Sequence, residues 1–292
     1  MTTQTFQHLT PYLWVTQSPI FATNSGILID AGQACLIDPG ITEEEIRGIA
    51  RFTLEQGASV QTIILTHGHW DHLLGPEYFP GVRVIAHTEY KHTLAQRSEA
   101  ILQQISSWEA QAGILRSQPL RLPQPTLAFE SVLHVHLGQY DLQLIPAPGH
   151  AADQIAIYEA ERGMLWAGDM LSDAEIPLVS HNLSAYQDTL ARLSALDVRV
   201  LIPGHGMPTD DPVEIRARLD GDQEYLQSLS TQVHAAVRAG KTLAETVEAC
   251  AGIPFRQPEE NAGPHRLNVE SAFVELGGIC ETPAVGWMRE EG

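Results

Sequence analysis

Lysine is scarce in this chain: Lys91 and Lys241 are the only two lysines among 292 residues, and arginine supplies the rest of the 17 basic side chains. Against these stand 36 acidic residues, which give a formal net charge of -19. Nucleic-acid binding depends on basic surfaces that neutralise phosphates. We therefore expect no nucleic-acid partner.

Cysteine is also rare, and its three positions, Cys35, Cys250 and Cys280, are far apart. No Cys-x-x-Cys pair occurs, so neither a disulfide framework nor a thiolate metal site is expected. No apolar run approaches the ~18 residues of a membrane-spanning helix, and the first residues lack the charged start and apolar run of a signal peptide. We therefore expect a cytoplasmic protein without a membrane partner.

The composition, 43% hydrophobic and 18% charged, predicts a chain that folds around a core. Strand patterns alternate with helix patterns, and several strand pairs are joined by short turns, which predicts mixed sheets. The expected strands are 12–16, 26–30, 34–38, 61–66, 82–86, 132–137, 140–145, 154–159, 164–167 and 198–202. Helices are expected from Thr42 to about Glu55, from Glu89 onward and over 184–196.

The pattern becomes helical after about residue 210. Apolar residues at helical spacing predict helices over Pro212–Ala239, Thr242–Ala251 and Arg266–Leu276. The polar segment Gly252–Pro264 between the last two is a candidate lid. We expect a first domain over residues 1–210 and a helical extension, residues 211–292, packed on it.

One short segment concentrates potential metal ligands directly after the strand expected at 61–66. In His67-Gly68-His69-Trp70-Asp71-His72, four candidate ligands fall within six residues. Imidazole nitrogens and carboxylate oxygens are ligands that zinc, iron and manganese share. We call residues 67–72 the histidine loop.

Three further residues occupy equivalent places in the chain. His150, Asp169 and His205 each follow an expected strand and lie beside a glycine. Strand ends are where sites assemble in α/β proteins. Each residue alone also fits an ordinary hydrogen-bonded loop position, but together with the histidine loop the three indicate a metal centre.

This order of motifs, from Leu36-Ile37-Asp38-Pro39-Gly40 through the histidine loop to His205, closely resembles the metallo-β-lactamase superfamily. The resemblance implies an α/β (α+β) fold, a four-layer αββα sandwich with a C-terminal helical extension. It also implies that Asp38 supports the ligands. The implied ligand sets are His67, His69 and His150 for one metal, Asp71, His72 and His205 for a second, and Asp169 as the bridge.

The resemblance also implies a reaction. Two divalent ions, zinc first and iron or manganese as alternatives, would share a hydroxide that attacks the substrate, with Asp71 as the catalytic residue that orients it. Asp169 disfavours lactam hydrolysis, and the chain is similar instead to hydroxyacylglutathione hydrolases and lactonases. We expect hydrolysis of a thioester, ester or lactone, with a small acyl molecule as the partner.

Several alternatives stay open. Ser172 stands where many lactonases carry tyrosine, and the extension is mostly acidic, although Arg256 and Arg266 could bind the carboxylates of glutathione. A mononuclear iron persulfide dioxygenase, whose relatives retain much of the same motif, is one alternative. A phosphodiesterase or nuclease is another, although the acidity of the chain weighs against it. His181 could contact substrate or be an ordinary surface histidine.

The remaining histidines and the oligomeric state are also open. His134 and His136 would share one face of a strand, either as an accessory metal site or as exposed cross-strand partners. The sequence is also compatible with a homodimer.

Overall fold

The computed structural model describes residues 4–114, 116, 117 and 119–279. Over these residues the chain forms a seven-stranded sheet, a five-stranded sheet and six α-helices, which confirms the predicted mixed α/β class. The chain divides into two compact units. The first unit runs through Pro146 and includes Asp153–Arg162, and the second comprises Ala147–Ala152 and the chain from Gly163 onward. Within the described part, no helix has both the length and the apolar character needed to cross a bilayer.

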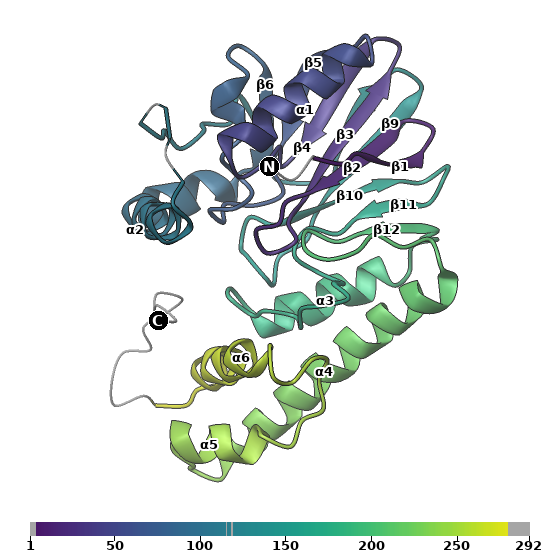
Figure 1. Ribbon diagram of the computed structural model, residues 1–292. Coiled ribbons are helices and arrows are strands. Elements are labelled where there is room, and N and C mark those ends of the chain that lie inside the picture. Colours follow the sequence, from purple (N-terminus) through teal and green to yellow (C-terminus); the bar gives the residue numbers. More distant parts are fainter. Residues whose placement is uncertain (1–3, 115, 118, 280–292) are drawn as a thin grey trace. The chain divides into compact units, whose positions relative to one another are not determined.

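The seven-stranded sheet lies in the first unit and keeps its strands in chain order (Figure 1). The strands are β1 (Gln7–Thr10), β2 (Leu13–Gln17), β3 (Asn24–Asp30), β4 (Gln33–Ile37), β5 (Ser59–Ile64), β6 (Arg83–His87) and β7 (Leu127–Phe129). β1 to β4 pair antiparallel, whereas β4 to β7 pair parallel. Parallel strands end at the same edge of a sheet, and Ile37 of β4 pairs with Ile64 of β5. The residues that follow these two strands therefore leave the sheet as neighbours.

Helix α1 (Glu43–Glu55) connects β4 to β5 and packs on β3 and β5. Thr42 caps the helix through a capping box with Glu45, and three glutamates in the first turn complement the helix dipole. Helix α2 (Glu89–Ala112) follows β6 and ends at Gly113 in the left-handed conformation. A short 3₁₀ turn, η1 (Pro76–Tyr78), lies between β5 and β6. Both helices contribute buried residues to one apolar core with the sheet.

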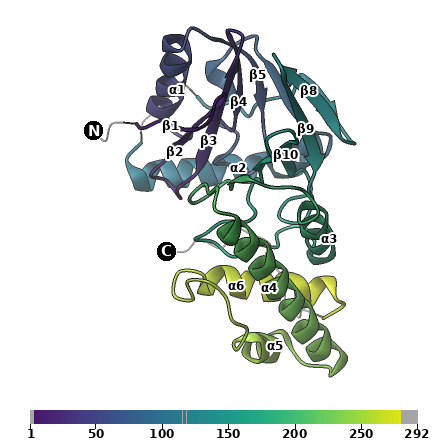
Figure 2. The same ribbon diagram turned by 90° about the vertical axis from the view of Figure 1, so that its right-hand side faces the viewer.

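The first unit also contains three strands of the five-stranded sheet, visible in Figure 2. These are β8 (Leu133–Leu137), β9 (Tyr140–Pro146) and β10 (Ile155–Glu159), which pair antiparallel in that order. β8 also contacts β3 and β4. The predicted hairpin around Gly138 is confirmed, because β8 and β9 pair directly on either side of it.

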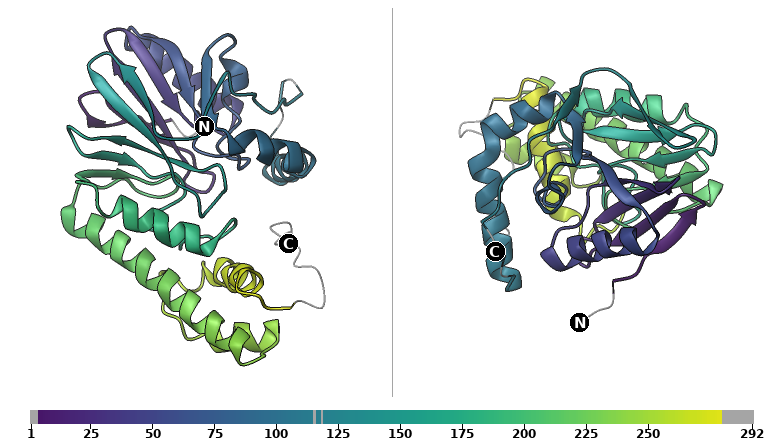
Figure 3. Two further views of the ribbon diagram at one scale, coloured as in Figure 1. Left: turned by 180° about the vertical axis from the view of Figure 1, so that it is seen from behind. Right: turned by 90° about the horizontal axis from the view of Figure 1, so that it is seen from above.

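The second unit begins with a parallel pair and continues as helices. β11 (Met164–Trp166) pairs with β12 (Val200–Ile202), and α3 (Leu183–Leu193) lies between them in the chain. The chain continues as α4 (Pro212–Arg238), α5 (Leu243–Cys250) and α6 (Ala262–Glu275). α4 packs against α3, α5 and α6, and its long green ribbon runs beside yellow α6 in Figure 3.

Some element boundaries differ from the predictions. α6 begins at Ala262 rather than Arg266, so the segment between α5 and α6 ends at Asn261. The glycine and proline at 263–264 suggested a loop, but a proline in the first turn of a helix loses no hydrogen bond. The short strands β1 and β7 were not predicted.

Candidate metal centre

The histidine loop leaves the sheet at the end of β5 and is almost completely buried. His67 is fully buried, and His72 and Asp71 are 1% and 6% exposed. The backbone that leads into the loop is held on both sides, because Leu65 donates to Ile85 and Thr66 accepts from Ile155. Two strands of the first unit, β6 and β10, therefore fix where the loop begins.

Asp38, which follows β4, is the main polar support of this loop. Its Oδ1 accepts the backbone N–H of Thr66 at 2.8 Å, and its Oδ2 accepts the Thr66 hydroxyl at 2.5 Å. The same Oδ2 lies 3.0 Å from Nδ1 of His72. Asp38 is 1% exposed and has a φ of 42°, a left-handed conformation that is uncommon outside glycine. Its carbonyl oxygen is held in turn by the Ser25 hydroxyl and the Gly40 N–H.

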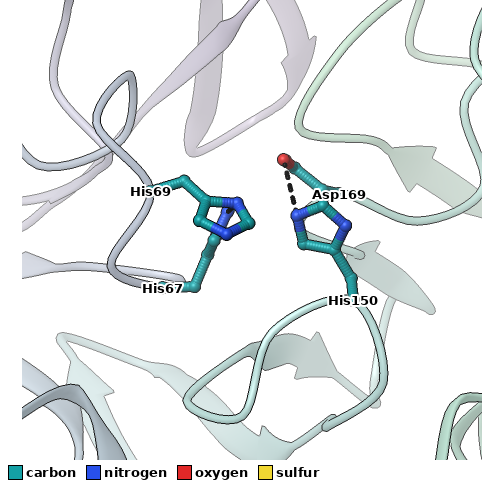
Figure 4. Close-up of side chains that lie close together, drawn as sticks. All are labelled: His67, His69, His150 and Asp169. Carbon is teal, nitrogen blue, oxygen red and sulfur yellow. Dashed lines mark hydrogen bonds and ion pairs between the residues drawn. The ribbon is translucent and has the colours of Figure 1, made fainter. Parts of the chain in front are cut away.

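The side chains within the histidine loop lie close together. Nε2 of His67 is 2.9 Å from Nδ1 of His69, and their rings meet edge to face at a centroid distance of 4.5 Å (Figure 4). Nε2 of His72 lies 3.4 Å from Oδ2 of Asp71. Four groups able to coordinate a cation are thus gathered at one end of β5.

Asp153 lies next to this loop, and the sequence did not indicate it as a residue of the site. A Cβ placed on Gly68 would lie 2.9 Å from Oδ2 of Asp153, which shows how closely the carboxylate approaches the loop. Asp153 is 1% exposed, and this burial raises the pKa of its carboxyl, while the nearby His67 acts in the opposite direction. It directly precedes the strand expected at 154–159, and the sequence around it gives no sign of this contact.

The other three predicted ligands meet within the second unit. Oδ2 of Asp169 lies 3.3 Å from Nε2 of His150 and 3.3 Å from Nε2 of His205, and the first of these contacts is drawn in Figure 4. Nδ1 of His150 lies 2.9 Å from the carbonyl oxygen of Leu178. A hydrogen bond there fixes the tautomer and turns Nε2 toward Asp169.

Glycine is required where the Asp169 and His205 segments approach each other. The N–H of Gly204 donates to the carbonyl oxygen of Gly168 at 2.6 Å. A Cβ on Gly204 would lie only 2.1 Å from Oδ1 of Asp169. The Gly-His pair at 204–205 therefore allows a carboxylate and an imidazole to share a small space.

Other candidate residues have local partners instead. His181 is exposed, and its backbone N–H donates to the carbonyl oxygen of Gly149. His134 and His136 are exposed and lie 2.8 and 3.4 Å from the carboxylate of Asp141 on the neighbouring strand. Arg266 forms an exposed ion pair with Glu270 in the same helix.

The aromatic residue inside the histidine loop belongs to an aromatic cluster. Trp70 is 7% exposed, and its ring centroid lies 5.4 Å from that of Trp108 and 6.1 Å from that of Phe21. Phe21 is 51% exposed and has a left-handed φ of 52°. This cluster places apolar surface directly beside the histidine loop.

Comparison with known proteins identifies the group that this chain resembles. The model of the metallo-beta-lactamase superfamily matches residues 19–205. An acyl-coenzyme A thioesterase from Homo sapiens is 28% identical over 159 residues, which is 49% of this chain and 54% of the relative. The chain thus spans about half the length of that relative.

Two further matches cover most of the chain. A hydroxyacylglutathione hydrolase from Thermosynechococcus vestitus is 26% identical over 266 residues, 89% of each chain. The crystal structure of a metallo-beta-lactamase family protein from Thermus thermophilus has a TM-score of 0.68 and 26% identity, and covers 92% of this chain and 95% of its own.

Proposed function

Because the chain belongs to the metallo-beta-lactamase superfamily, we propose that its histidines and aspartates form one centre for two divalent metal ions. Named relatives are hydrolases and thioesterases, and the chain is a metal-dependent hydrolase of this superfamily. In the proposed centre, His67, His69 and His150 hold one ion, Asp71, His72 and His205 hold the other, and Asp169 is shared.

The donor set within each unit fits such ions. Imidazole and carboxylate are the protein ligands that zinc, iron and manganese share. His67 and His72 are buried, as is the carboxylate of Asp71. Burial of ionisable groups is unfavourable unless they are paired or coordinate a metal. Within each unit, several buried imidazole and carboxylate groups lie within 3.4 Å of one another, and this crowding of ligand groups is the observation that carries the proposal.

The chain's own residues prepare the site for hydrolysis. Divalent ions bound there would supply Lewis acidity and lower the pKa of a water molecule. Asp71, with a side chain 9% exposed, is proposed to orient that water and to accept its proton. Nδ1 of His150 contacts the carbonyl oxygen of Leu178, which leaves Nε2 of His150 as the ligand atom. Nδ1 of His72 contacts Asp38, which leaves Nε2 of His72 as the ligand atom.

A thioester is the substrate class that we propose first. Both the acyl-coenzyme A thioesterase and the hydroxyacylglutathione hydrolase act, by their names, on acyl thioesters. The apolar surface of Phe21 and Trp70 suits an acyl group next to the histidine loop. Esters and lactones present a similar electrophilic carbonyl and remain part of the proposal.

The test uses protein of measured metal content, assayed with an acylglutathione thioester, an acyl-coenzyme A thioester, a lactone, a phosphodiester and glutathione persulfide. We expect turnover of at least one thioester, and we expect Asp71→Asn to lower kcat by about 100-fold or more. Asp141→Asn is the matched control, because that carboxylate is exposed and pairs with surface histidines. Oxygen uptake with the persulfide, or cleavage of the phosphodiester alone, would replace thioester hydrolysis with the corresponding alternative.

A further inference from the structure

Three charged side chains of the second unit are largely buried although the proposed chemistry does not use them. Arg218 and Asp222 lie one turn apart on α4 and are 4% and 1% exposed. Arg256 comes from the segment between α5 and α6, and its side chain is 20% exposed. Buried ion pairs rarely increase stability over apolar residues of similar size, so their retention calls for another explanation.

These side chains converge on the backbone that follows Asp169. Oδ2 of Asp222 accepts the N–H of Leu171 at 3.3 Å, while Arg218 donates to the carbonyl oxygen of Leu171 at 3.2 Å. Arg256 donates to the carbonyl oxygen of Ser172 and forms an ion pair with Asp222. The N–H and the carbonyl oxygen of Leu171, and the carbonyl oxygen of Ser172, thus all form hydrogen bonds with these three side chains.

Leu171 is the residue in this segment that needs such support. Its φ of 61° is left-handed, a conformation that is strained for a branched side chain, and the residue is 1% exposed. Strain of this kind persists only where the surroundings hold it in place. Because Leu171 is two residues beyond Asp169, its conformation determines how the chain leaves the carboxylate.

The same cluster reaches the His205 segment. Arg218 also donates to the carbonyl oxygen of Met207, two residues beyond His205, at 2.9 Å. One guanidinium therefore bonds both to the segment that follows Asp169 and to the segment that follows His205. In the same unit, Oδ2 of Asp169 lies 3.3 Å from Nε2 of His205. Arg218 therefore bonds to the two segments that carry these neighbouring side chains.

We propose that Arg218, Asp222 and Arg256 are positioning residues that set the orientation of the Asp169 carboxylate relative to His205, and thereby the affinity for a metal ion. The proposal rests on the proposed function, since it assumes that Asp169 and His205 are ligands. It also gives Arg256 a role within the protein in place of the contact with substrate carboxylates that the sequence suggested.

Helix α4 itself provides a matched control. Arg216 and Asp220, which are four residues apart like Arg218 and Asp222, form an ion pair at 2.6 Å, but both side chains are exposed, 62% and 42%. Removing that pair changes the same types of charge at an exposed place on α4, without touching the Asp169 and His205 segments. The test compares Asp222→Asn and Arg256→Gln with Asp220→Asn and Arg216→Gln.

The measurement is the affinity of metal-free protein for Co²⁺, from competition with a chromophoric chelator, together with the absorption spectrum of the bound Co²⁺. Removing residues that orient ligands typically lowers metal affinity by about 10- to 100-fold. We expect Asp222→Asn and Arg256→Gln to lower the affinity for at least one Co²⁺ in this range and to alter its spectrum, and we expect the control variants to stay within about 2-fold of wild type. Arg256→Lys, which keeps the charge, should recover part of the affinity.

Circular dichroism and the unfolding temperature of the metal-free proteins show whether each variant folds. Folded Arg256→Gln and Asp222→Asn proteins with wild-type Co²⁺ affinity and spectrum would overturn the positioning role alone, whereas wild-type protein that binds no Co²⁺ would overturn the proposed function as well. If Asp222→Asn does not fold, the comparison of Arg256→Gln with Arg256→Lys decides.

Discussion

The Nδ1 atom of His72 lies 3.0 Å from Oδ2 of Asp38, and both side chains are completely buried. The same carboxylate accepts both the N–H and the hydroxyl of Thr66, so one side chain holds the start and the end of the histidine loop. With Nδ1 occupied in this way, Nε2 of His72 is the atom that can coordinate a metal ion.

Replacing Asp38 by asparagine should impair the metal centre without changing the size of the side chain. An amide has a single acceptor oxygen, so it cannot serve the three donors that the two carboxylate oxygens now accept. We expect Asp38→Asn to lower kcat/KM, or the affinity for the metal that His72 holds, by about 10- to 100-fold. The measurement is steady-state turnover at measured metal content.

Asp141→Asn serves as the control here too, because Asp141 is an exposed carboxylate that also contacts histidine. Equal activity and equal metal content in Asp38→Asn and wild type would show that the histidine loop does not depend on this carboxylate.

Adding one methyl group at Gly204 should disturb the Asp169 carboxylate. The new Cβ would lie 2.1 Å from Oδ1 of Asp169 and 3.0 Å from the carbonyl carbon of Gly168, so the carboxylate has to move. We expect Gly204→Ala to lose most of its activity and metal affinity. Gly252→Ala is the comparison, because a Cβ there meets nothing within 4 Å. Similar losses in both variants, or in neither, would contradict this explanation of Gly204.

The buried thiol of Cys35 predicts a specific dependence of stability on pH. Burial raises the pKa of this thiol to about 12, whereas a thiol in an unfolded chain ionises near pH 8.5, about the reference value. The folded state therefore keeps the proton that the unfolded state loses, and the stabilisation that Cys35 contributes is complete below pH 8.5 and declines as pH rises toward 12.

The free energy of unfolding of wild type minus that of Cys35→Ala should fall by about 2 kcal/mol between pH 7 and 10. Chemical denaturation at several pH values provides both quantities. Iodoacetamide should also leave Cys35 unmodified in the folded protein at pH 8. A difference that does not vary with pH would mean that the thiol has an ordinary pKa.

The parts of the site that sequence could predict are those in which ligands are close neighbours in the chain. The histidine loop follows a recognisable β-branched strand, and the structure places it at the end of β5. The hairpin that leads to Asp38 was equally clear, because two apolar runs flank a turn at Ala31 and Gly32.

What sequence could not predict depends on contacts between distant segments. Nothing near Asp153 marks it as a carboxylate that packs under Gly68, and nothing near Arg256 shows that its partner is Asp222, 34 residues away. The sequence suggested that Arg256, in a mostly acidic extension, could bind substrate carboxylates. Long-range packing, rather than local pattern, determines both roles.

Metal content and thioester turnover, measured on the same preparation during stepwise reloading of metal-free protein with Zn²⁺, test the dinuclear hydrolase proposal most directly. We predict that metal-free protein is inactive, that hydrolysis rises until about two ions are bound per chain, and that Asp71→Asn remains nearly inactive at full loading. Hydrolysis that persists after complete metal removal, or activity that appears only with about one iron per chain and consumes oxygen, would contradict it.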